Sequence, residues 1–158
     1  EITEKFSLKH GEYALATAHR AENTDAPDAL LRVIGYLRKQ SETGPVVFPL
    51  HPRTKAAIKR DGLDLDPLII CDPVGYLEMV SLIKGARIVL TDSGGLQKEA
   101  YFHGVPCVTM RKETEWVETI EAGWNRLWTE SEYRPRKSIN EYGDGHAAEK
   151  ILKILSSN

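Results

Sequence analysis

Short apolar runs alternate with longer segments of helical period along most of the chain. The runs are rich in β-branched residues, and most are apolar on both faces, which is typical of parallel strands covered by helices on both sides. The predicted strands are Tyr13–Ala18, Pro45–Leu50, Pro67–Cys71, Arg87–Thr91, Pro106–Met110 and Asn125–Trp128.

Segments between and after these runs repeat apolar residues at the i, i+3, i+4 and i+7 spacing of a helix face. In the first segment Asp25 is expected to cap the helix, Pro27 suits its first turn, and Arg38 and Lys39 suit its last. Three predicted helices have apolar stripes, which are Leu30, Val33, Ile34 and Leu37, then Tyr76, Met79, Val80 and Ile83, and then Ala148, Ile151, Leu152 and Leu155. A fourth helix is predicted directly after Gly94 and Gly95. This alternation predicts an α/β fold, a Rossmann-like, doubly wound parallel sheet of about six strands.

Length and composition fit one globular domain, residues 1–158. Hydrophobic residues make up 41% and charged residues 28%, which excludes collagen, low-complexity and coiled-coil chains. The net charge of -2 argues against a nucleic-acid partner, and no apolar run approaches the ~18 residues of a membrane span. Cys71 and Cys107 lie inside apolar runs, which favours buried thiols in a reducing cytoplasm.

The chain begins with Glu1, and its first ten residues lack the apolar stretch of a signal peptide. We therefore expect a piece of a longer cytoplasmic protein. Neither a metal nor a cofactor is expected, because the histidines form no H-E-x-x-H and neither cysteine has a C-x-x-C partner.

Polar residues that follow the predicted strands are the candidates for function, because ligands of such folds bind beyond the carboxyl ends of the strands. Four loops qualify, and they are His19–Asn23, His51–Thr54, Thr91–Gly95 and Arg111–Trp116.

The loop from Thr91 to Gly95 runs from a strand through two glycines into a helix. Glycines allow close backbone approach, and free N–H groups at a helix start favour an anion. Ser93 adds a hydroxyl, so Ser93, Gly94 and Gly95 suit a phosphate or diphosphate. The alternative is a tight turn with no ligand. The loop matches neither a Walker A motif nor G-x-G-x-x-G.

Two other kinds of side chain accompany this loop. Glu99 lies on the apolar face of the following helix, where it could accept from ribose hydroxyls; the alternative is an exposed surface charge. His19 and His51 each follow a strand and precede an arginine, a pairing that suits phosphate oxygens or proton donation to a leaving group. Their alternatives are a core-edge histidine and a turn residue held by Pro52. The tryptophans at 116, 124 and 128 and Met79 are interpreted as packing residues.

Several segments in this order resemble the non-hydrolysing UDP-N-acetylglucosamine 2-epimerases. The H-R-x-E-N segment is present as His19-Arg20-Ala21-Glu22-Asn23, and the T-D-S-G-G-x-x-x-E-A segment as Thr91 to Ala100. Phe48 to Arg53, Gly104-Val105-Pro106, Arg111 to Gly123 and Tyr142 to Gly145 also fit. The resemblance covers nearly the whole chain but only the C-terminal half of that family, one of the two Rossmann-like domains of a GT-B architecture.

The resemblance implies roles that the residue pattern alone does not reveal. Ser93, Gly94 and Gly95 would hold the UDP diphosphate, and Glu99 the ribose. The Val74 backbone would pair with uracil and Met79 would pack on it. The implied UDP site also includes Arg20, Glu22 and His51, whereas His19 would contact the diphosphate and take part in catalysis.

The implied reaction interconverts UDP-GlcNAc and UDP-ManNAc by elimination and re-addition of UDP. The carboxylates that move the C2 proton would lie in the missing N-terminal domain, so the isolated chain is expected to be inactive, and the full-length enzyme to be a homodimer. The family commonly has E-R-P-E where this chain has Glu115-Trp116-Val117-Glu118. An epimerase of a modified UDP-sugar, the donor domain of a GT-B glycosyltransferase and a non-catalytic nucleotide-sugar-binding module remain alternatives.

Overall fold

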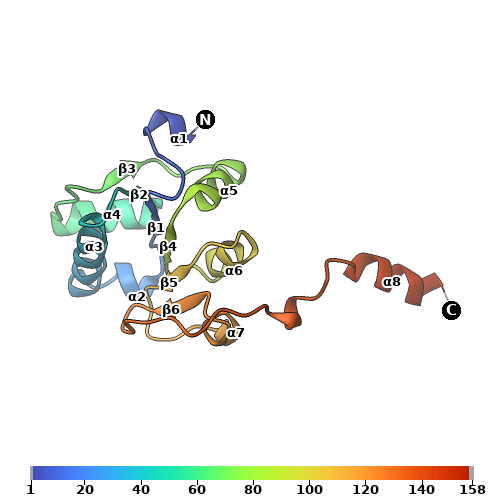
Figure 1. Ribbon diagram of the computed structural model, residues 1–158. Coiled ribbons are helices and arrows are strands. Elements are labelled where there is room, and N and C mark those ends of the chain that lie inside the picture. Colours follow the sequence, from blue (N-terminus) through green and yellow to red (C-terminus); the bar gives the residue numbers. More distant parts are fainter. Residues whose placement is uncertain (1, 157–158) are drawn as a thin grey trace.

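A computed structural model describes residues 2–156 and shows one sheet of parallel strands (Figure 1). The strand order is β3-β2-β1-β4-β5-β6. The strands are β1 (Ala14–Thr17), β2 (Val46–Pro49), β3 (Ile69–Cys71), β4 (Ile88–Thr91), β5 (Cys107–Thr109) and β6 (Asn125–Leu127). β1 and β4 are neighbours at the point where the order reverses, which is where folds of this class bind ligands. The predicted α/β fold is confirmed.

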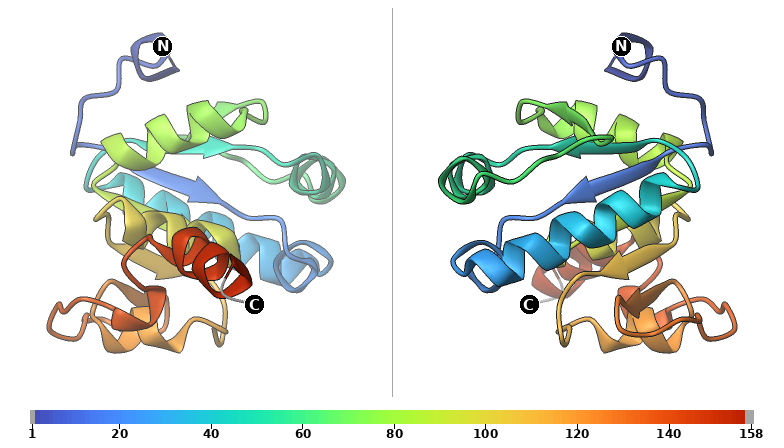
Figure 2. Two further views of the ribbon diagram at one scale, coloured as in Figure 1. Left: turned by 90° about the vertical axis from the view of Figure 1, so that its right-hand side faces the viewer. Right: turned by 90° about the vertical axis from the view of Figure 1, so that its left-hand side faces the viewer.

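Helices cover both faces of the sheet, as the two views of Figure 2 show. The four predicted helices are present as α3 (Pro27–Ser41), α5 (Tyr76–Gly85), α6 (Gly94–Phe102) and α8 (Ala147–Ser156). The structure adds α1 (Ile2–Lys5), α2 (Ala21–Thr24), α4 (Pro52–Asp61), α7 (Val117–Glu121) and a 3₁₀ turn at Asn140–Tyr142.

Two apolar cores lie on opposite faces of the sheet because successive strand residues point to opposite sides. Ala14 and Ala16 of β1 belong to the core shared with α3 and α4, whereas Tyr13 and Leu15 belong to the core shared with α5 and α6. This explains why the strands are apolar at nearly every position instead of at alternate ones.

Truncation in the first core is expected to be costly. Leu37 of α3 is fully buried, whereas Leu31 of the same helix is 57% exposed. We expect Leu37→Ala to lower the free energy of unfolding by about 2–5 kcal/mol, because it leaves a cavity, and the matched Leu31→Ala to change it by no more than about 0.5 kcal/mol. Urea unfolding followed by circular dichroism measures both values. Equal effects of the two substitutions would contradict the assigned phase of α3.

Four local predictions need correction. Each strand is shorter than predicted by one or two residues, although end residues such as Leu50 and Met110 still donate to a neighbouring strand. Asp25 does not cap α3: the N-cap position is Ala26, with no side-chain cap, because the Asp25 carboxylate accepts hydrogen bonds from the Arg53 guanidinium at 2.7 and 2.9 Å. That contact holds the pKa of Asp25 below its usual range.

The segment after His51 was expected to be a loop and is instead α4. Its sequence is mostly polar, and its buried residues are only Thr54, Ala57 and Ile58, so the apolar stripe is too short to stand out. Cys107 is buried as predicted, but Cys71 is only half-buried because β3 is an edge strand. Burial raises the pKa of both thiols.

The tryptophans pack in separate places. Trp124 lies edge-on to Tyr101 and donates its indole N–H to the Lys137 carbonyl at 3.0 Å, and Trp128 lies edge-on to Tyr36. The interpretation of these two tryptophans as packing residues is therefore consistent with the structure, whereas the Trp116 ring lies beneath the Lys98 ammonium, 4.1 Å from its centroid.

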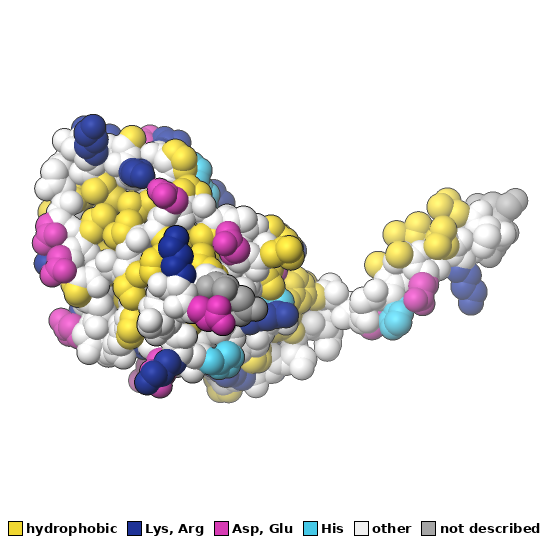
Figure 3. All heavy atoms as spheres, turned by 90° about the horizontal axis from the view of Figure 1, so that it is seen from above, with side chains coloured by type: hydrophobic (Ala, Val, Ile, Leu, Met, Phe, Trp, Pro, Cys, Tyr) yellow, Lys and Arg dark blue, Asp and Glu magenta, His cyan; other side chains and the backbone are white. Residues whose placement is uncertain are grey.

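α8 has the predicted apolar stripe, but the stripe contacts no core. Figure 1 shows the helix reaching away from the sheet, and Figure 3 shows apolar side chains along one of its sides and charged ones along the other. Ile151, Leu152, Ile154 and Leu155 are between 56 and 68% exposed.

Candidate functional site

A cavity of about 210 Å³ lies beyond the carboxyl ends of β1, β2 and β4. Five of the predicted site residues line it, namely His19, His51, Val74, Met79 and Ser93. They come from four separate segments of the chain, each of which follows one of the strands β1 to β4. A wider hollow of about 650 Å³ near α1 shares Pro73 and Val74 with this cavity.

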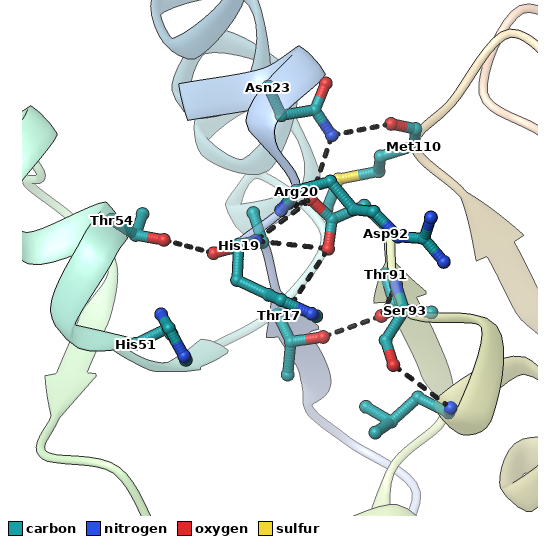
Figure 4. Close-up of polar contacts among 12 residues, drawn as sticks. Thr17, His19, Arg20, Asn23, His51, Thr54, Thr91, Asp92, Ser93 and Met110 are labelled. Carbon is teal, nitrogen blue, oxygen red and sulfur yellow. Dashed lines mark hydrogen bonds and ion pairs between the residues drawn. The ribbon is translucent and has the colours of Figure 1, made fainter. Parts of the chain in front are cut away.

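His19 is held by the carboxylate of Asp92, the first residue after β4 (Figure 4). Its backbone N–H donates to Asp92 Oδ2 at 2.9 Å, and its ring Nδ1 lies 3.3 Å from Asp92 Oδ1. Arg20 N and Asn23 Nδ2 donate to the same carboxylate at 2.9 and 3.0 Å. Asp92 is fully buried, so the loop after β1 is joined tightly to the loop after β4.

His51 is the N-cap residue of α4, and Pro52 follows it at the first helical position. Its Nδ1 accepts the Arg53 backbone N–H at 3.2 Å, as N-cap side chains do. The ring centroids of His51 and His19 are 5.3 Å apart. His51 is therefore a helix N-cap and not the turn residue of the alternative interpretation, and the same ring also lines the cavity.

Ser93 is the N-cap of α6, and its Oγ accepts the Leu96 N–H at 3.5 Å. Gly94 is buried, and a Cβ there would collide with the Glu115 carboxylate. Gly95 is exposed, and the nearest atom to a Cβ there would be Ser93 Oγ at 3.8 Å. Packing therefore explains Gly94, whereas packing within this chain does not require Gly95 to lack a side chain.

Glu99 lies on α6 but does not line the cavity. Its side chain is 34% exposed, and its Oε2 is 3.7 Å from His103 Nε2. The residue is neither a free surface charge nor a buried acid, so both expectations about it stay open.

Arg20 and Glu22 also lie outside the cavity, in a network of ion pairs. Arg20 Nη2 is 3.5 Å from Glu115 Oε1, and Arg111 bridges Glu115 at 2.7 Å and Glu22 at 2.8 Å. A hydrogen bond from its own backbone, and then the Arg111 guanidinium, hold the pKa of Glu115 below its usual range. Glu22 thus positions Arg111 and does not reach the cavity.

The sequence reasoning missed Asp92, Asn23 and Arg111 as members of the site. Asp92 offered one signal, since it lies inside the Thr91–Gly95 loop that was selected as a candidate. Asn23 and Arg111 stand in motifs that were noticed, but only the contact between loops far apart in the chain shows what each one does.

A family model described as UDP-N-acetylglucosamine 2-epimerase matches residues 1–156. The chain belongs to the UDP-N-acetylglucosamine 2-epimerase family. The resemblance deduced from the motifs is therefore confirmed.

Relatives with this name, and one epimerase with a different substrate in its name, are similar to the chain in sequence or in structure. The UDP-2,3-diacetamido-2,3-dideoxy-D-glucuronate 2-epimerase of Pseudomonas aeruginosa is 46% identical over 157 residues, 91% of this chain and 44% of the relative. The UDP-GlcNAc 2-epimerase of Methanocaldococcus jannaschii, solved in complex with UDP-GlcNAc and UDP, is 33% identical with a TM-score of 0.80, over 100% of this chain and 49% of that one. The chain thus spans about half the length of the curated relatives it matches.

Two further properties of the described residues bear on function. None of their helices is long and apolar enough to cross a bilayer. Nor do residues 2–156 bring together three or more side chains of the kinds that hold a metal ion.

Proposed function

We propose that this chain is the UDP-binding, C-terminal half of a non-hydrolysing 2-epimerase of UDP-linked 2-acetamido sugars. The observation that carries the proposal is the cavity at the β1–β4 reversal, which gathers His19, His51, Val74, Met79 and Ser93. The complex of the M. jannaschii relative with UDP-GlcNAc and UDP supports the same ligand class.

The diphosphate would lie at the start of α6. Ser93 and the N–H groups of Gly94 and Gly95 would donate to it, and the positive end of the helix dipole would favour its charge. The open space above Gly95 supports this placement. Uracil would pair with the Val74 backbone and pack on Met79. The Glu99 carboxylate would give up its contact with His103 and accept hydrogen bonds from the ribose hydroxyls.

In the proposed reaction, the C2 proton and the bond from C1 to the UDP oxygen are lost, giving 2-acetamidoglucal and UDP. UDP then adds back to C1, and a proton returns to C2 on the opposite face. The C2 hydrogen is not next to a carbonyl, so stabilising the departing diphosphate contributes most to catalysis. His19, Arg20 and the α6 start would supply that stabilisation.

The sugar itself has two candidates, UDP-GlcNAc and a UDP-2,3-diacetamido-glucuronate. The 46% identity to the P. aeruginosa relative favours the second, and the family name favours the first. A likeness to a heptosyltransferase has only 16% identity and a TM-score of 0.52, which shows a shared fold and gives no support for glycosyl transfer.

The other half of the protein would carry the proton-transfer carboxylates and close the cleft over the ligand. The whole protein would work in the cytoplasm. The exposed apolar face of α8 supports a partner surface, either that missing half or a second copy in a homodimer. Light scattering on the full-length protein would tell the monomer from the dimer.

Deuterium exchange at C2 tests the proposal. In heavy water the full-length protein is expected to exchange the C2 proton of one or both UDP-sugars and to epimerise it, whereas the isolated chain is expected to bind UDP weakly and exchange nothing. Weak binding follows because one side of the ligand stays in water, where charged contacts are screened. Proton NMR of each sugar follows the reaction. Exchange by the isolated chain above buffer background would place the proton-transfer groups in this half, and no exchange by the full-length protein would contradict the epimerase proposal.

A further inference from the structure

Asp92 is a charged group inside the protein. Its side chain is fully buried and accepts from three N–H donors, all of them uncharged: the backbones of His19 and Arg20 and the amide of Asn23. A buried carboxylate is costly unless it is hydrogen-bonded and paired. Within residues 2–156 its ion-pair partner is the ring of His19, since the Arg20 guanidinium turns toward Glu115.

The contact with the ring is made at one nitrogen only. Asp92 Oδ1 approaches His19 Nδ1 at 3.3 Å, and such contacts in ligand-free sites commonly tighten when substrate binds. A carboxylate beside Nδ1 keeps a proton on that nitrogen and fixes the plane of the ring. Nε2, on the other side of the ring, is then free for a ligand in the cavity that His19 lines.

His51 is held in the opposite way. Its Nδ1 accepts the Arg53 backbone N–H and so carries no proton while that bond is made, which leaves a neutral ring protonated at Nε2. The two rings line one cavity with their centroids 5.3 Å apart. They differ in which ring nitrogen carries the proton, Nδ1 in His19 and Nε2 in His51. His51 therefore serves as an internal reference for His19.

We infer that Asp92 is a positioning residue for His19: it holds the ring through Nδ1 so that Nε2 faces the ligand. In the proposed epimerase, a His19 ring carrying both protons would donate to Asp92 and to the departing diphosphate at once, and Asp92 would offset the ring's charge. This last step rests on the proposed function; the orientation of the ring does not.

The first test uses the unaltered chain. Two-dimensional NMR that correlates imidazole protons with ¹⁵N reports which ring nitrogen carries the proton. At mildly alkaline pH we expect Nδ1–H for His19 and Nε2–H for His51. A His19 ring protonated only at Nε2, with or without UDP, would overturn the inference. Failure of UDP to bind would count against the proposed function instead, since the ligand-free pattern stands by itself.

The second test is a double-mutant cycle in the full-length protein. Because Asp92 acts through His19, Asp92→Asn is expected to lower turnover at least ~10-fold with little change in KM, and to add nothing to His19→Asn. Thr54→Val is the matched control, since the Thr54 hydroxyl donates to the Ala18 carbonyl, next to His19 in the same loop, and not to the ring. Losses that add in the double variant, or an equal loss in Thr54→Val, would show that Asp92 merely holds the loop together.

Discussion

His19→Asn in the full-length protein is expected to lower the turnover of the proposed epimerase reaction by at least ~100-fold, the low end of the loss on removing an acid–base or electrostatic catalyst. The asparagine amide is close in position to ring Nδ1, so it can still donate to Asp92 Oδ1 and keep the loop after β1 in place. What it removes is Nε2, the nitrogen that the contact of Nδ1 with Asp92 leaves available to a ligand. The loss should therefore appear in kcat more than in the unfolding free energy.

Steady-state kinetics with the epimerised UDP-sugar measures this effect. His10→Asn is a suitable control, because His10 is exposed in the loop that precedes β1, at the opposite end of the sheet. Near-normal turnover of the His19 variant would remove this residue from the chemistry, even if UDP still binds.

The second large effect is expected at the start of α6. Gly95→Asp in this chain should abolish detectable UDP binding, because the new carboxylate would meet the diphosphate and repel it. The fold should survive, since the position is exposed, a Cβ there has no neighbour closer than 3.8 Å, and an acidic residue suits the first turn of a helix.

Calorimetric titration with UDP compares three chains. We expect the affinity to fall in the order Gly95, Gly95→Ala, Gly95→Asp, with the alanine variant separating the effect of bulk from that of charge. Circular dichroism checks that all three are folded. A folded Gly95→Asp chain with unchanged affinity would show that the diphosphate binds elsewhere.

The fold was largely predictable because each of its elements has a local signature. Runs apolar on both faces marked the strands, and stripes at helical spacing marked α3, α5 and α8. α4 escaped because its stripe is only three residues, and Asp25 was misassigned as a cap because Arg53, 28 residues away in sequence, takes its carboxylate.

The site was predictable in part, through the rule that parallel strands end at one edge of the sheet. That rule selected the loops of His19, His51 and Ser93, whereas Val74 and Met79 came only from the family resemblance. Glu22, which the family resemblance assigned to UDP binding, pairs with Arg111 at 2.8 Å and does not line the cavity, so its role at the ligand stays a prediction.

The sequence by itself determined the class of fold, the order of its elements and the loops that carry chemistry, because those depend on residue types close together in the chain. Tertiary structure alone decided which loops meet. Pairing of β1 with β4 brings Thr17 beside Thr91, 74 residues away, and so sets Asp92 under His19. Such contacts form between segments that no local pattern connects, and they exist only after the sheet has assembled.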